Sequence, residues 1–128
     1  MGKAVVIAHD VDERELLIEL LDEIGLEAVV ETVIPSGVAD PSVVLTDLGP
    51  RYDPTKGRAA VRRLRERWPQ APVILLTSHR AATEELDQLG ADALIQKPFD
   101  LDDLTNAVRR LIARSETREQ GPRLRLGA

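Results

Sequence analysis

The sequence predicts one α/β domain with a five-stranded parallel sheet and helices on both faces, and two observations lead to this fold class. Along the 128 residues, five short apolar runs alternate with segments that carry apolar residues at helical spacing. The apolar runs lack an alternation of polar and apolar residues, which is typical of strands buried on both faces. Parallel strands are joined by crossover connections, so helices should cover both faces of the sheet.

The expected elements can be assigned in chain order. The apolar runs predict strands at residues 4–8, 27–31, 43–46, 73–76 and 93–95. The amphipathic segments predict helices at residues 12–24, 57–68 and 81–89, and a last helix that begins after Asp100 and carries its apolar stripe to Ile112. Two Pro and one Gly between residues 32 and 41 leave no room for a full helix there. The second helix of a regular alternation is therefore expected to be shortened or missing.

The first helix has clear boundary signals. Asp10 or Asp12 can cap its amino end, and Glu13 and Glu15 suit its first turn, where the helix dipole favours negative charge. Gly25 supplies a left-handed stop at its carboxyl end. At the other end of the chain, residues 115–128 show no apolar periodicity. They are expected to form a flexible basic tail or linker that follows a domain of residues 1–114.

Composition excludes several classes of function. Without Cys, the chain can have no disulfide, thiolate nucleophile or Cys-based zinc site. Its only aromatic residues are Tyr52, Trp68 and Phe99, too few for a platform that stacks single-stranded nucleic acid. The net charge is −5, and because the chain from Arg109 onward carries six Arg and two Glu, the first 108 residues carry −9. We therefore expect no direct binding to nucleic acid.

The chain also lacks the signals of a membrane or exported protein. No apolar run approaches the roughly 20 residues that a membrane-spanning helix needs. Residues 1–3 lead straight into a strand rather than into a signal peptide. The cytoplasm is the expected location.

Three polar residues stand directly after apolar runs. Asp47 ends the third strand, Thr77 ends the fourth, and Lys97 follows the fifth. Because the carboxyl ends of parallel strands meet at one edge of the sheet, a carboxylate, a hydroxyl and an ammonium can converge there. Such a crevice is suited to receiving a phosphoryl group.

Three segments give the chain a resemblance to response-regulator receiver domains, which have the CheY-like type of flavodoxin-like fold. They are residues 43–48 (VVLTDL), 72–78 (PVILLTS) and 90–99 (GADALIQKPF), in the order and near the spacing of that family. The resemblance covers residues 3–114. It implies that Asp47 is the phosphoacceptor, that Lys97 contacts the phosphoryl oxygens or Asp47 itself, and that Thr77 moves toward the phosphoryl group. It also implies a Lys97–Pro98 peptide bond that is often cis.

Each of these residues also has an ordinary structural interpretation. Asp47 could simply end a strand as a turn residue, Thr77 could satisfy a backbone group at the end of its strand, and Lys97 could be a surface side chain. These alternatives stay open on the sequence alone.

The chain departs from the family pattern at the expected metal site. The first strand of a receiver domain usually ends in two adjacent acidic residues that bind Mg²⁺, but the matching positions here are Ala8 and His9. Asp10 could supply the missing oxygen or cap the helix instead, and Gly49 would offer its backbone carbonyl. The expected metal ligands are thus Asp47, Asp10 and Gly49, in a Mg²⁺ site that is weakened or absent.

These observations lead to two hypotheses. The first is a non-enzymatic receiver domain of a two-component phosphorelay, which accepts a phosphoryl group at Asp47 from a histidine kinase or phosphotransfer protein and relays it to a downstream protein target. The alternative is a pseudo-receiver, an interaction module that works without phosphorylation. Pairing through residues 80–113 could give a homodimer. A small α/β enzyme is not supported, because Gly-rich phosphate loops, Walker motifs and nucleophile elbows are missing from the sequence.

Overall fold

The computed structural model describes residues 2–35, 37–47, 54–77 and 90–127, with the side chains of the last helix described as far as Arg114. In chain order, its elements are β1 (Gly2–Ile7), α1 (Val11–Ile24), β2 (Leu26–Glu31), β3 (Val43–Asp47), α2 (Pro54–Arg67), β4 (Val73–Thr77), β5 (Ala93–Gln96) and α4 (Leu101–Gly127). The helix expected at residues 81–89 lies outside the described residues.

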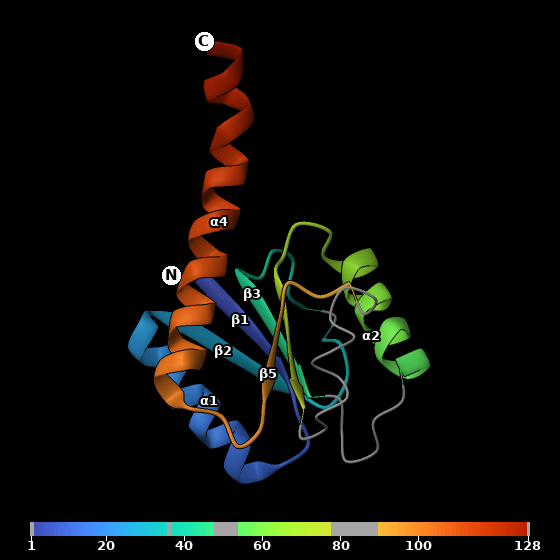
Figure 1. The fold of residues 1–128 in the computed structure, drawn as a ribbon. Helices are drawn as coiled ribbons and strands as arrows, with labels where there is room; N and C mark the ends of the chain where they lie inside the picture. The colour runs from blue at the N-terminus through green and yellow to red at the C-terminus, as the bar shows by residue number, and fades with distance from the viewer. Residues whose placement is uncertain (1, 36, 48–53, 78–89, 128) are drawn as a thin grey trace.

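The five strands form one parallel sheet in the order β2-β1-β3-β4-β5 (Figure 1). This confirms the predicted flavodoxin-like fold class. The chain leaves β1 in one direction to reach β2 and later returns past β1 to form β3, so the strand order reverses between β1 and β3. A crevice outside the carboxyl ends of the strands at such a reversal is the usual ligand site of an open α/β sheet.

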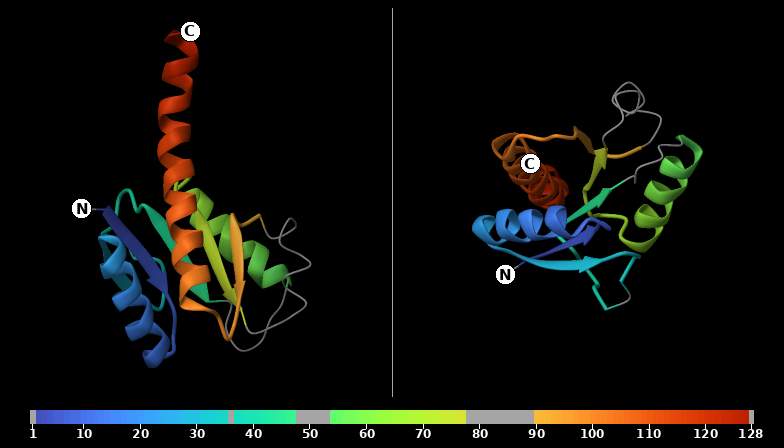
Figure 2. Two further views of the ribbon diagram at one scale, coloured as in Figure 1. Left: turned by 60° about the vertical axis from the view of Figure 1, so that its left-hand side comes forward. Right: turned by 90° about the horizontal axis from the view of Figure 1, so that it is seen from below.

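Helices cover both faces of the sheet. Figure 2 shows α1 and α4 on one face and α2 on the other. Alternate strand residues point to opposite faces, so each strand contributes to two cores. On β4, Ile74 and Leu76 pack into the core beneath α1 and α4, whereas Val73 and Leu75 pack into the core beneath α2.

Local capping explains where α1 begins and ends. The Oδ1 atom of Asp10 accepts a hydrogen bond from the backbone N–H of Glu13 at 2.9 Å, so Asp10 is the N-cap. Gly25 takes the left-handed conformation at the carboxyl end with φ of 97°, and its N–H bonds back to the carbonyl of Asp22 at 3.0 Å. The first turn of α1 is thereby held just beyond the carboxyl end of β1.

The connection between β2 and β3 contains no helix in its described part, residues 32–35 and 37–42, as predicted. It is instead anchored to the end of α2 through Val38. The backbone carbonyl of Val38 accepts hydrogen bonds from Trp68 Nε1 at 2.9 Å and from Arg67 Nη2 at 3.0 Å. Val38 itself is buried in the core beneath α2. The side chain and the carbonyl of Val38 thus hold the connection between β2 and β3 against the end of α2.

A shallow groove of about 460 Å³ lies where a helix between β2 and β3 would pack. Its lining is mostly apolar and comes from β1, β3, α2 and the connection itself: Ile7, Thr32, Val33, Ile34, Thr46, Ala60, Arg63 and Leu64. Val33 is 68% exposed at this place. The shortened connection therefore leaves part of one sheet face open.

The last helix, α4, runs from Leu101 to Gly127 and extends well past the sheet (Figure 1). The expectation that a domain of residues 1–114 is followed by a tail or linker of residues 115–128 stays a prediction. Residues 115–120 contain neither Gly nor Pro, so nothing in the sequence ends the helix at Arg114. In the described part of the chain, none of the helices is long and apolar enough to cross a membrane.

Candidate functional site

The site is built around a lysine at the carboxyl edge of the sheet. Asp47 is the last residue of β3, and Lys97 directly follows β5, two strands away. The Lys97 Nζ atom donates a hydrogen bond to Asp47 Oδ2 at 2.6 Å. The structure therefore brings together two of the three residues singled out in the sequence, and does so by a direct ion pair.

A second carboxylate, that of Glu13, joins this pair. From the sequence, Glu13 was expected only to suit the first turn of a helix. Lys97 Nζ also donates to Glu13 Oε2 at 3.0 Å. The side chains of Glu13 and Asp47 are each only 10% exposed, and that of Lys97 is 24% exposed. One ammonium thus lies between two buried carboxylates that come from α1 and β3.

The environment shifts the proton equilibria of two of these groups. Burial raises the pKa of the Glu13 carboxyl above its ordinary value of 4.5, and the neighbouring Asp47 carboxylate adds to this effect, although the hydrogen bond from Lys97 opposes it. Burial by itself would lower the pKa of Lys97. Its hydrogen bonds to Asp47 and Glu13 outweigh that penalty, so the pKa of Lys97 is raised above 10.5. Lys97 stays charged at neutral pH and holds the two carboxylates together.

Thr77 is the fully buried last residue of β4, the strand that pairs with both β3 and β5. Its backbone carbonyl accepts a hydrogen bond from the Lys97 N–H at 2.6 Å. The Lys97–Pro98 peptide bond that follows is cis, as the family resemblance implied. Thr77 therefore lies at the same edge of the sheet as Lys97, and the backbones of the two residues are joined directly.

The end of β1 is not acidic. Ala8 is fully buried, and its carbonyl accepts a hydrogen bond from Arg14 Nε at 2.7 Å. His9 is exposed. Asp10 uses its carboxylate to cap α1, which matches one of the two interpretations offered for it; its role as a metal ligand stays a prediction. Gly49, the third expected ligand, lies outside the described residues.

Among the described residues there is no cluster of three or more acidic or His side chains that could hold a metal ion. Glu13 and Asp47 supply two carboxylates. Mg²⁺ usually keeps several water ligands and takes one or two carboxylates together with phosphate oxygens. The donors that are present fit a magnesium site of that kind.

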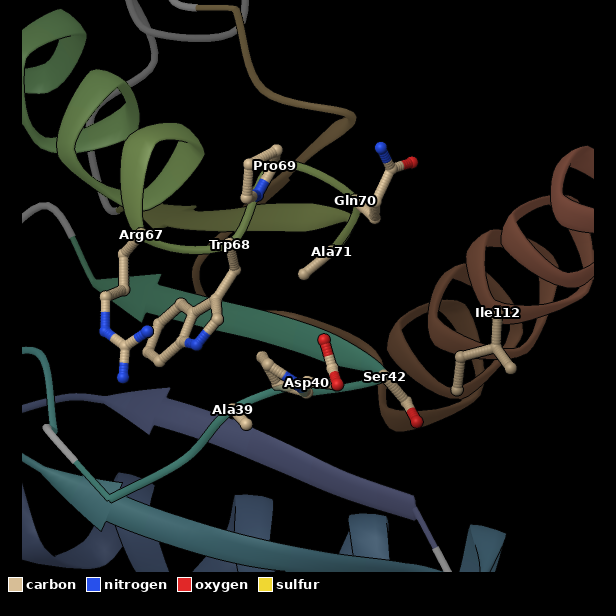
Figure 3. A pocket seen from close by; sticks show the side chains of 10 residues that line it. Ala39, Asp40, Ser42, Arg67, Trp68, Pro69, Gln70, Ala71 and Ile112 are labelled. Carbon is tan, nitrogen blue, oxygen red and sulfur yellow. The ribbon is translucent and has the colours of Figure 1, made fainter.

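Another cavity, of about 290 Å³, lies at the opposite edge of the sheet from Asp47 (Figure 3). It is lined by residues that precede β3 and β4, by the end of α2 and by one residue of α4: Ala39, Asp40, Pro41, Ser42, Arg67, Trp68, Pro69, Gln70, Ala71 and Ile112. Its polar groups do not form a cluster of catalytic or metal-binding type. The ion pair of Lys97 with Asp47 lies at the carboxyl edge instead.

Comparison with known proteins identifies the family. Residues 10–109 match the family described as the response regulator receiver domain, which is more than half of the chain. This chain belongs to the response regulator receiver family. The match spans Asp47, Thr77 and Lys97, the residues that the geometry brings to one edge.

Relatives and solved structures agree with this membership. The chain is 31% identical over 129 residues to the DNA-binding transcriptional regulator NtrC of Klebsiella pneumoniae, covering 93% of this chain and 26% of that protein. It is 34% identical over 127 residues to the transcriptional regulatory protein CpxR of Klebsiella pneumoniae subsp. pneumoniae, covering 94% of this chain and 53% of that protein. A receiver domain from Clostridium thermocellum, 22% identical, superimposes with a TM-score of 0.70 over 91% of this chain and 98% of its own, which supports the fold alone.

The receiver chain spans about a quarter of the length of NtrC and about half of CpxR. Receiver domains of two-component response regulators are typically non-enzymatic signalling domains that interact with histidine kinases and downstream effector domains, and they generally bind Mg²⁺ at an acidic pocket. Membership of this family indicates a role in signal transduction.

Glu13 is the site residue that sequence reasoning missed. It stands in the first turn of α1, where a negative charge suits the helix dipole, and this ordinary interpretation hid its contact with Lys97. One signal was available. A helix that follows a strand of a parallel sheet begins at the carboxyl edge, so the first turn of α1 had to lie beside Asp47.

Proposed function

We propose that this receiver domain accepts a phosphoryl group at Asp47 from a histidine kinase or phosphotransfer protein and passes the signal to a downstream protein as a change of surface. The observation that carries the proposal is the 2.6 Å contact between Lys97 Nζ and Asp47 Oδ2 at the carboxyl edge of the sheet. A carboxylate held by an ammonium at the open end of a parallel sheet is ionised at neutral pH. It is therefore ready to act as a nucleophile.

In the proposed reaction, a carboxylate oxygen of Asp47 attacks the phosphorus of a phosphohistidine. A new O–P bond forms while the P–N bond to the donor breaks, and the imidazole nitrogen leaves with the bonding electron pair. The transferred group brings additional negative charge to the site. Lys97 stabilises that charge because it is already within hydrogen-bond distance of the carboxylate. A bound Mg²⁺, held by Asp47 and a second carboxylate, would neutralise phosphoryl oxygens in the same way.

Thr77 is proposed to relay the event. A hydroxyl at the end of β4 can donate a hydrogen bond to a phosphoryl oxygen on the neighbouring β3, and this would pull Thr77 toward Asp47. The surface that would change comprises residues 80–113, of which residues 80–89 lie outside the described residues. Contact with the downstream partner, and pairing of two copies, would use this surface. A cytoplasmic location and the lack of direct nucleic-acid and membrane binding belong to the same proposal.

Phosphorylation by a small-molecule donor tests the proposal directly. The purified protein is incubated with phosphoramidate and Mg²⁺, and intact-mass spectrometry is expected to show the gain of one phosphoryl group. The Asp47→Asn variant should gain none. The matched control is Asp22→Asn, an exposed residue of α1, which should be modified like the wild type. Equal modification of wild type and Asp47→Asn would contradict Asp47 as the acceptor.

A second candidate is the pseudo-receiver, an interaction module that works without phosphorylation. One observation favours it: the end of β1 carries Ala8 and His9, and neither supplies a carboxylate to the site. The two candidates predict different results in the same assay. A wild-type protein that stays unmodified by phosphoramidate and by a cognate kinase would favour the pseudo-receiver.

A further inference from the structure

The inference begins from an unpaired oxygen in the site. Glu13 Oε2 accepts a hydrogen bond from Lys97, but Glu13 Oε1 is buried and has no hydrogen-bond partner among the described residues. The Glu13 side chain as a whole is nine-tenths buried. Buried polar atoms are normally paired, because a carboxylate oxygen that gives up water without gaining another partner destabilises the folded state.

The charge balance of the site indicates the kind of partner that is missing. When both carboxyls are ionised, Glu13 and Asp47 carry two negative charges against the one positive charge of Lys97, so these three groups together have a surplus of −1. The nearest other cation on α1, Arg14, directs its Nε to the carbonyl of Ala8. A bound water could donate a hydrogen bond to Glu13 Oε1, but it would leave the surplus charge in place. A small cation with a preference for oxygen would satisfy both the atom and the charge.

We propose that Glu13 provides the second carboxylate of a divalent cation site for Mg²⁺, together with Asp47, in place of the acidic residues missing from the end of β1. The inference deepens the proposed function, because the cation would neutralise the same phosphoryl group. It concerns a residue on α1 rather than on the strand. The carboxylate ligand would then come from the first turn of α1 instead of from the end of β1.

The competing donors near β1 are less suitable. The carboxylate of Asp10 is directed to the backbone N–H of Glu13, where it caps α1, and His9 is exposed. Glu13, by contrast, is already within hydrogen-bond distance of the same ammonium as Asp47. The carboxylate of Asp10 binds the backbone N–H of Glu13, whereas the carboxylate of Glu13 faces Lys97.

Lys97 sets the strength of the site. Its ammonium occupies one oxygen of each carboxylate, so a cation must share these groups with an existing positive charge. Binding of Mg²⁺ to the unmodified protein is therefore expected to be weak. A phosphoryl group on Asp47 adds oxygens and negative charge, so binding should strengthen once it is present.

Titration with Mg²⁺ alone, followed by amide NMR shifts and by calorimetry, tests the assignment. Glu13→Gln keeps the size of the side chain and removes its charge, and it should weaken Mg²⁺ binding at least tenfold. Glu15→Gln, an exposed neighbour on α1, removes the same charge and should bind like the wild type. Asp10→Asn keeps an oxygen that can cap the helix and should weaken Mg²⁺ binding less than Glu13→Gln does. A well-dispersed amide spectrum of each variant shows that it is folded.

Three results would overturn the inference: equal Mg²⁺ affinity of Glu13→Gln and wild type, loss of binding in Asp10→Asn but not in Glu13→Gln, or no saturable binding by the wild type. The titration contains no phosphoryl donor. Its failure therefore leaves the mass-spectrometric test of Asp47 unaffected, and an unmodified Asp47 would leave the cation site measurable. Repeating the titration with beryllofluoride, a phosphoryl mimic, should strengthen Mg²⁺ binding in the wild type more than in Glu13→Gln.

Discussion

At the scale of single residues, the site depends on one ammonium shared by two carboxylates. The contacts of Lys97 with Asp47 and Glu13 raise the pKa of Lys97 even though it is partly buried. Burial beside Asp47 also raises the pKa of the Glu13 carboxyl, but for an acid a raised pKa disfavours the charged form. The charged form of Glu13 is thus less favourable in the folded protein than in the unfolded chain, and this difference has a measurable consequence for stability.

A group with a raised pKa in the folded state contributes its stability below its unfolded pKa of about 4.5, and that contribution is lost as the pH rises through the folded value. Glu13→Gln cannot titrate. In metal-free buffer, the free energy of unfolding of this variant relative to the wild type is therefore expected to increase as the pH rises from about 4 to 7. Urea denaturation at several pH values measures it.

The control for this experiment is Glu15→Gln, which removes one negative charge from the exposed side of the same helix. A difference between Glu13→Gln and wild type that stays constant or decreases with rising pH would contradict the raised pKa of Glu13.

At the scale of secondary-structure elements, Asp92 joins three of them. Its Oδ2 atom accepts a hydrogen bond from the backbone N–H of Val73, at the start of β4, at 2.8 Å and from Arg65 Nη2 on α2 at 2.7 Å. Arg65 also donates to the carbonyls of Ala71 and Gly90. Asp92 precedes β5. This junction holds the amino ends of β4 and β5 against the end of α2, and so supports the strands that carry Thr77 and Lys97.

Replacing Asp92 by Ala is expected to reduce the free energy of unfolding by about 1–3 kcal/mol, because the buried N–H of Val73 loses its side-chain acceptor. Glu66→Ala also removes an acid, but from an exposed position on α2, and should change stability by less than about 0.5 kcal/mol. Chemical denaturation of both variants gives the comparison. Equal stabilities would mean that the junction does not hold these elements.

At the scale of the whole molecule, only the first part of the long helix α4 is seen to pack against the sheet. The side chains of α4 that enter the core are Leu104, Val108 and Leu111, with Ile112 packed against them. Beyond that point α4 extends away from the sheet (Figures 1 and 2). The described contribution of α4 to the core therefore ends close to Arg114, although the helix does not.

A chain that ends at Arg114 is accordingly expected to fold with a stability within about 0.5 kcal/mol of the full chain. Leu111→Ala should instead cost about 2–5 kcal/mol, because Leu111 is only 5% exposed and its removal leaves a cavity between α4 and the sheet. Thermal and urea denaturation of both proteins test the pair of expectations. A large loss of stability in the shortened chain would show that residues 115–128 belong to the folded domain.

The sequence by itself predicted the fold class and the strands, and it placed Asp47, Thr77 and Lys97 at strand ends, because buried parallel strands and the polar residues after them are local patterns. It also determined the missing helix between β2 and β3, since Pro and Gly exclude a helix locally. The position of Glu13 against Lys97 was decided only in the tertiary structure. A Glu in the first turn has the same local sequence signal in any helix, and only the packing of α1 beside the sheet places the carboxylate of Glu13 against Lys97. Local rules describe which element a residue belongs to, whereas burial and neighbouring charge depend on elements that are distant in the chain.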